Sequence, residues 1–258
     1  MKITALLENT TTREDMQIEH GLSLYIETDS HKILFDTGQT DLFAKNAKTL
    51  GIDLSKVDFV ILSHGHYDHG GGLHTFLELN DTAPIYMSRF AFELHYSALE
   101  KYIGLDTTLV ECSRIRFVDD TLTIAPGVTL HSCNDRTRTS DLGCFGLSTL
   151  ENGVLVPDDF RHEQYLLLEE AGKTVLISGC SHKGILNIMD WFCPDVLVGG
   201  FHFMKLLPGD PLTDAAKQLN NYKTRYFTGH CTGEEQFAFL KSRMKHLEYL
   251  SCGKTISV

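Results

Sequence analysis

The chain has 258 residues, of which 42% are hydrophobic, and its formal net charge is −11. This composition supports a real hydrophobic core, and the length suffices for one large domain or two small ones. The acidic balance argues against a nucleic-acid-binding protein, which normally presents a basic surface. No apolar stretch approaches the roughly 18 residues of a membrane span. We therefore expect a small-molecule substrate, with neither nucleic acid nor a membrane as partner.

The cysteines and the N-terminus indicate a compartment. The seven cysteines are odd in number and irregularly spaced, which argues against a disulfide framework and favours a reducing cytosol. The segment Met1–Glu8 has no long apolar run and is interpreted as a first strand, not an export signal. We expect a cytoplasmic protein, either a monomer or a homodimer.

Short apolar runs bounded by turn residues predict strands in the first half of the chain. The expected strands are Ile3–Leu7, Leu22–Glu27, Lys32–Phe35, Phe59–Leu62 and Pro84–Met87. Helical spacing of apolar residues predicts helices over Asp41–Leu50, just past Gly72, and over Phe90–Leu99. Because Phe59–Leu62 is continuously apolar, it should be buried on both faces.

The second half predicts a similar mixture. Strands are expected at Ile115–Val118, Leu122–Ile124, Val128–His131, Gln164–Glu169, Thr174–Ile177, Val196–Val198 and Arg225–Thr228. Helices are expected at Gly184–Phe192, Thr213–Tyr222 and Glu234–Met244, and Asn134–Gly146 should be a polar loop. The order predicts an α/β (α+β) protein whose two halves each combine a sheet with outer helices.

The most informative segment is Ser63-His64-Gly65-His66-Tyr67-Asp68-His69, which directly follows the apolar run Phe59–Leu62. His64 and His66 lie two residues apart and leave the strand end on the same side. Asp68 and His69 follow after the chain begins to turn, and we expect them to face a second metal. Three imidazoles and a carboxylate in so small a volume suit a borderline-soft divalent metal such as zinc.

This His-x-His-x-Asp-His motif resembles that of the metallo-β-lactamase superfamily, and the resemblance extends along nearly the whole chain. Phe35-Asp36-Thr37-Gly38 matches the turn that buttresses the histidine loop there, and Gly229-His230 matches a late metal-binding turn. The resemblance implies a four-layer αββα sandwich forming a single domain over residues 1–258. It also implies one or two Zn²⁺ ions, with manganese, iron or magnesium as alternatives, and a ligating or catalytic role for Asp68.

Four further phrases resemble a subfamily of hydrolase-like proteins that includes an archaeal dihydropterin synthase of the methanopterin pathway. They are Glu19-His20-Gly21-Leu22-Ser23, Gly179-Cys180-Ser181-His182, Gly199-Gly200-Phe201-His202 and Gly229-His230-Cys231-Thr232-Gly233. In the synthase reaction that this resemblance implies, a reduced pterin is joined to an aminobenzene ribose phosphate and pyrophosphate is expelled.

Two places of the superfamily pattern are less regular. A hairpin there separates a third histidine ligand from a metal-bridging aspartate, and by spacing His162 and Cys180 take these places. A thiolate in place of the aspartate favours softer metals. His182, two residues beyond Cys180, is the preferred additional ligand, with His162 either the alternative or a surface histidine in the charged run 158–163. Cys180 has a second interpretation as a buried structural thiol.

The remaining candidates follow later strands. His230 lies in a glycine-flanked turn after Arg225–Thr228 and is expected to bind metal. His202 ends a neighbouring strand and is expected to donate a proton or a hydrogen bond to substrate. Cys231 points away from the metals if the chain is extended, so it is interpreted as structural. His20 and the other loop residues near it line the cleft or are simply polar, and the histidines at 31, 74, 95, 131 and 246 form no recognisable group.

The predicted metal ligands are therefore His64, His66, Asp68, His69, Cys180, His182 and His230, with Asp68 and His202 as catalytic residues. These residues predict a metal-dependent hydrolase with a dinuclear centre, in which metal-activated hydroxide attacks a small ester, lactone or phosphoester. The alternatives are a synthase-type transferase that displaces pyrophosphate and an inactive sensor that binds a metal or small ligand. No Gly-x-Ser-x-Gly elbow and no P-loop occur.

Overall fold

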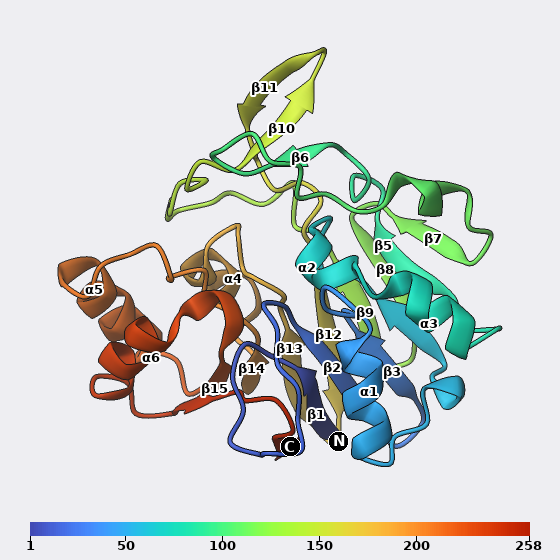
Figure 1. Ribbon diagram of the computed structural model, residues 1–258. Helices are drawn as coiled ribbons and strands as arrows, with labels where there is room; N and C mark the ends of the chain where they lie inside the picture. Colours follow the sequence, from blue (N-terminus) through green and yellow to red (C-terminus); the bar gives the residue numbers. More distant parts are fainter.

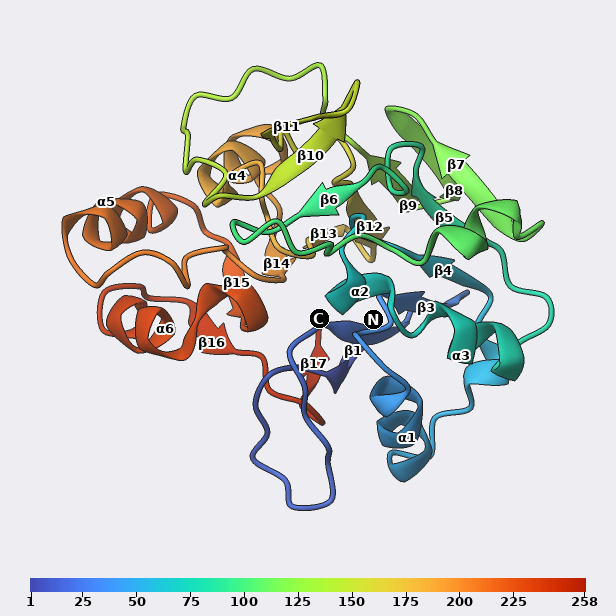
Figure 2. The ribbon, with the colours of Figure 1, turned by 45° about the horizontal axis from the view of Figure 1, so that its top comes forward.

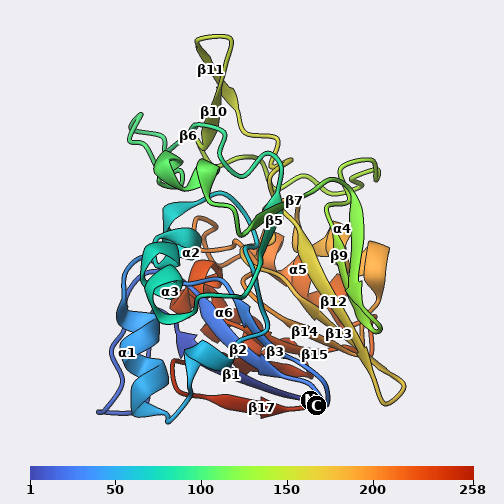
Figure 3. The same cartoon turned by 90° about the vertical axis from the view of Figure 1, so that its right-hand side faces the viewer.

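Two seven-stranded β-sheets lie face to face in the computed structural model, which describes residues 1–258 (Figures 1 and 3). In spatial order, the first sheet contains β17 (Thr255–Ser257), β1 (Lys2–Leu7), β2 (Ser23–Glu27), β3 (Lys32–Phe35), β4 (Phe59–Ile61), β5 (Ile85–Ser88) and β7 (Ile115–Val118). The second contains β16 (Leu247–Tyr249), β15 (Arg225–Thr228), β14 (Val196–Val198), β13 (Lys173–Ile177), β12 (Tyr165–Glu170), β9 (Val128–His131) and β8 (Thr121–Ala125).

Helices cover the outer face of each sheet. The helices of the chain are α1 (Leu42–Thr49), α2 (Tyr67–Gly70), α3 (Leu73–Leu79), α4 (Ile185–Phe192), α5 (Asp210–Leu219) and α6 (Glu234–Lys241), with short 3₁₀ turns at Leu54–Lys56, Thr107–Glu111 and His230–Thr232. Apolar residues of α1 and α3 pack on the first sheet, and those of α4, α5 and α6 pack on the second. The expected four-layer αββα arrangement is confirmed. None of these helices is both long and apolar enough to cross a membrane.

The strands show why this sandwich forms. In β3, Ile33 and Phe35 point into a central cluster between the two sheets, whereas Leu34 points outward to the helices. Strand β13 repeats the pattern, with Leu176 on the outer face between two inward residues. Because side chains alternate along a strand, a continuously apolar strand must be covered on both faces. Each fully buried aliphatic side chain contributes roughly 1.5–3 kcal/mol.

A small third sheet lies beside the sandwich and contains β11 (Val154–Pro157), β10 (Ser148–Glu151) and β6 (His95–Tyr96), seen at the top of Figure 1. The predicted helix over Phe90–Leu99 is wrong, because this segment forms turns and β6. The backbone of His95 pairs with Thr149, and Leu99 is exposed, so the helical spacing of apolar residues does not reflect a buried helix face. Tertiary pairing with β10 overrides the local pattern.

Other boundaries differ less. Helix α5 begins at Asp210, three residues before the expected start, because proline is well tolerated in a first helical turn. The hairpin β10–β11 and the strands β16 and β17 are not predicted by the sequence patterns. The polar segment 134–146 lacks helix and strand, as expected.

Candidate metal centre

The predicted site residues meet at one edge of the sandwich, where parallel strands of both sheets end. Strands β13, β14 and β15 are parallel neighbours, and they lead into Cys180, His202 and His230. Strands β3 and β4 are also parallel, and they lead into Asp36 and His64. Figure 2 shows the ends of β13, β14 and β15 facing α2, the helix that follows His66. The carboxyl ends of parallel strands are the usual location of ligand sites in open sheets.

The backbone at these strand ends is strained. Asp36, Ser181, His202 and His230 all have positive φ angles, between 48° and 60°. Side chains other than glycine rarely adopt this left-handed conformation, which costs on the order of 1–3 kcal/mol for each residue. Strained turns of this kind gather at functional sites, and here they occur at the edge of the sandwich where the predicted site residues meet.

Asp36 holds the histidine loop. Its carboxylate accepts hydrogen bonds from the Ser63 amide at 2.7 Å, the Ser63 hydroxyl at 2.7 Å and Nδ1 of His69 at 2.6 Å, all fully buried. The Ser63 hydroxyl therefore uses its proton on Asp36 and accepts from Nδ1 of His64, 2.8 Å away. Both histidines carry their proton on Nδ1, so both Nε2 atoms present a lone pair.

The first group of ligand atoms surrounds Nε2 of His69. Nε2 of His230 lies 3.1 Å from it and Sγ of Cys180 lies 3.2 Å from it. Nδ1 of His230 donates to Asn9, so its Nε2 is also a lone pair. Oδ2 of Asp68 lies 3.4 Å from Nε2 of His230 and 3.9 Å from Nε2 of His69. The metal-ligand atoms thus converge, and no proton lies between Nε2 of His69 and Nε2 of His230.

The second group lies on the other side of His64. Nε2 of His182 is 3.3 Å from Nε2 of His64, and His64, His66 and His182 form a buried set of ligand atoms. Nδ1 of His182 and Nε2 of His66 are buried without any hydrogen-bond partner. Such groups are costly unless something satisfies them.

A zinc ion fits both groups. With Zn–N distances of about 2.0–2.1 Å, two nitrogen ligands of a tetrahedral ion lie roughly 3.3 Å apart. The Nε2 separations of 3.1 Å and 3.3 Å match that spacing. Imidazoles, one carboxylate and one thiol form a donor set for a borderline-soft ion. The residues present therefore suit the divalent metal that the sequence predicts.

The surroundings favour the metal-binding protonation state of three of the histidines and of Asp68. Burial lowers the pKa of His64, His66 and His182 well below the ordinary histidine value, and the neighbouring imidazoles lower it further. Burial also opposes ionisation of Asp68, but His69, His20 and His230 outweigh it and hold the pKa of Asp68 well below its usual range. At His69, burial lowers the pKa, but the neighbouring Asp36 and Asp68 outweigh it and raise the pKa. Neutral imidazoles and an ionised carboxylate are the forms that bind metal.

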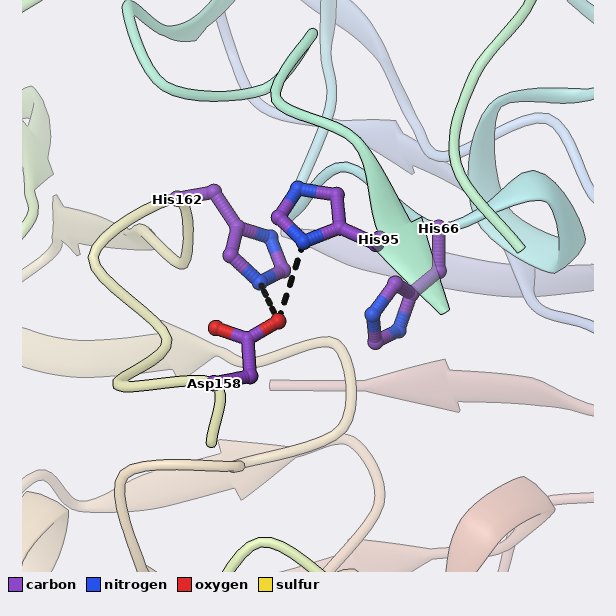
Figure 4. Close-up of side chains that lie close together, drawn as sticks. All are labelled: His66, His95, Asp158 and His162. Atoms are coloured by element: carbon purple, nitrogen blue, oxygen red, sulfur yellow. Dashed lines mark hydrogen bonds and ion pairs between the residues drawn. The ribbon is translucent and has the colours of Figure 1, made fainter. Parts of the chain in front are cut away.

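Figure 4 shows a neighbouring group in which His95 and His162 converge on Asp158, with His66 beside them. Nδ1 of His162 accepts from the Gly65 amide at 2.9 Å, so its Nε2 carries the proton that faces Oδ2 of Asp158 at 3.3 Å. Nδ1 of His95 lies 2.9 Å from the same oxygen. Both nitrogens of His162 are therefore occupied by protein groups, whereas Nδ1 of His182 has no partner. The interpretation of His162 as a surface histidine is wrong, because the residue is fully buried.

Several residues at the site have no interpretable signal in the sequence. Glu8, fully buried at the end of β1, accepts the His230 amide at 2.5 Å. Glu163, also buried, accepts the His182 amide at 2.7 Å. The histidine at 95, which the sequence pattern leaves ungrouped, is buried beside Asp158. His20 is the exception, because it belongs to a Glu-His-Gly phrase of the subfamily pattern. In the structure, Nε2 of His20 lies 3.3 Å from Oδ2 of Asp68.

Cys231 and His202 lie beside Cys180. The three ligand atoms are within 4.8 Å of one another, and all three residues are buried. The interpretation of Cys231 as pointing away is wrong, because the residue lies in a 3₁₀ turn, not in extended chain. The ring of His202 is 4.2 Å from that of His182, so its predicted catalytic role is compatible with its position. The roles of all the predicted site residues stay predictions.

Comparison with known proteins agrees with this geometry. A family model described as the metallo-beta-lactamase superfamily matches residues 18–219. The chain is 30% identical to 7,8-dihydropterin-6-methyl-4-(beta-D-ribofuranosyl)-aminobenzene-5'-phosphate synthase of Methanocaldococcus jannaschii, over 92% of this chain and 90% of that protein. It is 27% identical to an uncharacterised protein of the same organism, over 99% and 100% of the two chains.

Among solved structures, the chain resembles one described as a metal-dependent hydrolase of the beta-lactamase superfamily. The TM-score is 0.85 at 31% identity, and the match covers 100% of this chain and 99% of the other. The family match, the relatives and the arrangement of strands and histidines agree. The chain belongs to the metallo-β-lactamase superfamily.

Proposed function

We propose that this protein is a metal-dependent hydrolase that acts on a small ester, lactone or phosphoester, with zinc in one or two positions. The observation that carries the proposal is the convergence of Nε2 atoms from four histidines at one edge of the sandwich, namely His64, His69, His182 and His230. The name of the similar solved structure, a metal-dependent hydrolase, supports the same class of reaction.

A cavity beside these residues offers room for a small substrate. Its volume is about 550 Å³, and His182 and Asp158 line it together with the loop segment 138–144. Arg138 lies at its exposed rim and donates to the backbone carbonyl of Asp159 at 2.7 Å. Lys183 is buried with its ammonium bound to three oxygens, so Arg138 is the better placed cation for an anionic substrate group.

A bound metal supplies Lewis acidity and lowers the pKa of a coordinated water to about 7. The protein provides the arrangement around it. Asp68 is ionised and accepts from His20 across 3.3 Å, so its carboxylate orients a proton of the nucleophile and takes little part as a strong base. His202 is placed beside His182 to donate a hydrogen bond to the leaving group. Phe160 stacks on His182 at a ring separation of 4.5 Å and excludes water from that side.

The test is metal content and hydrolysis by His66→Ala. We expect loss of bound zinc and of activity on a panel of nitrophenyl esters, nitrophenyl phosphodiesters and acyl lactones. His74→Ala is the matched control, because His74 is an exposed histidine paired with Asp106. If the His66→Ala variant contains no metal and is still as active as the wild type, the proposal is refuted.

The second candidate is a synthase-type transferase, which the 30% identity to the archaeal synthase over nearly its whole length favours. In that reaction the site would hold the pyrophosphate leaving group and would not activate water. Pyrophosphate release from a reduced pterin diphosphate, only in the presence of an aminobenzene ribose phosphate acceptor, would favour this function. Zinc-loaded protein that is inert to both substrates but active on the ester panel would exclude it.

A further inference from the structure

Cys180, His202 and Cys231 are three metal-binding side chains that come together beside the histidine groups. They follow the adjacent parallel strands β13, β14 and β15, which places them next to one another at the same sheet edge. Their side-chain ligand atoms all lie within 4.8 Å of each other. The exposed fractions of the three residues are 3%, 9% and 2%, so water does not solvate them freely.

The local backbone is shaped around this group. A Cβ atom at Gly200 would lie 2.3 Å from Sγ of Cys231, so only glycine leaves room for the thiol. His202 adopts a left-handed φ of 55°, a strained conformation that turns its ring toward the two cysteines. Nδ1 of His202 is buried and has no hydrogen-bond partner. The thiol of Cys231 has the carbonyl of Cys180 as its contact at 3.3 Å, which is a weak hydrogen bond.

We propose that Cys180, His202 and Cys231 form a thiolate–imidazole site that selects a soft or borderline divalent ion of the zinc class over hard ions such as Mg²⁺. Two thiolates and one imidazole match zinc in donor type, and their two negative charges balance the ion. Both sulfurs bind the ion as thiolates, so any thiol proton passes to solvent and no other bond breaks.

This site is continuous with the histidine groups, because Sγ of Cys180 lies 3.2 Å from Nε2 of His69. The inference concerns which metal the chain selects. It makes one ring nitrogen of His202 a ligand, and the other nitrogen stays available for the hydrogen bond that the proposed function gives this residue. It does not depend on the substrate or on hydrolysis. Cys180 would belong to both groups, and Cys231 distinguishes the two.

The experiment is a Co²⁺ titration of the metal-free full-length protein, followed by thiolate-to-cobalt absorption in the near ultraviolet. We expect this band in the wild type and a loss of about half its intensity in Cys231→Ser, since one of two thiolate ligands is removed. Cys180→Ser should show a similar loss. Cys112→Ser is the matched control, because Cys112 is a partly buried cysteine outside the site, and its band should equal that of the wild type.

A band that disappears in Cys180→Ser but is unchanged in Cys231→Ser would overturn the inference, because Cys180 would then act alone with the histidines. A wild-type protein that binds Co²⁺ without any thiolate band would overturn it as well. Neither result depends on whether the same samples hydrolyse esters, so this experiment and the test of the proposed function can fail independently.

X-ray absorption of zinc-loaded wild-type protein provides a measurement that needs no variant. We expect sulfur ligands at about 2.3 Å in a number that corresponds to two zinc–sulfur bonds for each chain. One such bond, or none, would contradict the assignment of Cys231. A thiol titration of protein purified and denatured without reductant should also find all seven thiols free. Five free thiols would contradict the site, since a disulfide cannot supply two thiolates.

Discussion

Replacement of Asp36 by asparagine tests the central support of the site. The Asp36 carboxylate is fully buried and accepts three hydrogen bonds, two from Ser63 and one from Nδ1 of His69. In Asp36→Asn one carboxylate oxygen becomes an NH₂ group. This donor then faces groups that donate to the carboxylate in the wild type. His69 can relieve this conflict only by moving its proton from Nδ1 to Nε2. That proton then points at Nε2 of His230 and Sγ of Cys180, where a metal would bind.

The magnitude follows from these contacts. Hydrogen bonds to charged groups are each worth about 1.5–3 kcal/mol, and removal of one partner of a buried charged pair costs about 3–5 kcal/mol. We therefore expect the free energy of unfolding of Asp36→Asn, measured with a chelator present, to be about 3–5 kcal/mol lower than that of the wild type. We also expect zinc affinity to fall by about 10- to 100-fold, as is typical when a group that orients a metal-bound histidine is lost.

The assays are urea denaturation in chelator and zinc binding by competition with a chromophoric chelator. Asp53→Asn is the matched control, because Asp53 is exposed and caps a short turn through Ser55, a role that asparagine fulfils equally well. Zinc affinity of folded Asp36→Asn equal to that of the wild type would refute the argument that Asp36 sets the tautomer of His69.

Three further predictions follow from other contacts. His162→Leu removes the acceptor of the Gly65 amide, so zinc affinity should fall about 10-fold, while saturating zinc per chain stays at the wild-type value; a lower zinc content would instead make His162 a ligand. Arg138→Gln should lower kcat/KM for phosphoesters by about 10-fold or more and leave neutral esters unaffected, and equal loss on both substrates would contradict its role toward an anionic group. In the metal-free protein, the free energy of unfolding should decrease as the pH falls below 6.5. The unfolded chain then binds protons that the folded chain does not bind, because burial lowers the pKa of three histidines in the folded state. The slope is up to about 1.4 kcal/mol per pH unit for each of these histidines, and His69, whose pKa is raised, offsets part of it. Those histidines are His64, His66 and His182, and a flat denaturation profile between pH 7 and pH 5 would contradict the prediction.

The amino-acid sequence by itself determines the features that depend on neighbouring residues. Short apolar runs bounded by turn residues predict most strands of both large sheets, since a continuously apolar strand must be covered on two faces. The spacing of His64, His66, Asp68 and His69 places four ligands within six positions, so any strand followed by a turn brings them together. The buttressing turn at Asp36 is likewise recognisable from its resemblance to the family pattern.

The tertiary structure alone decides which distant side chains complete the site. Strand β6 has two residues, too few for any periodic pattern, and its pairing with β10 places His95 beside Asp158. The choice between His162 and His182 depends on which nitrogens the Gly65 amide and Asp158 already occupy. Cys231 turns toward Cys180 because the chain after β15 forms a 3₁₀ turn and is not extended. Hydrogen bonds and packing between segments far apart in the chain fix these orientations, and no local spacing of residues encodes them.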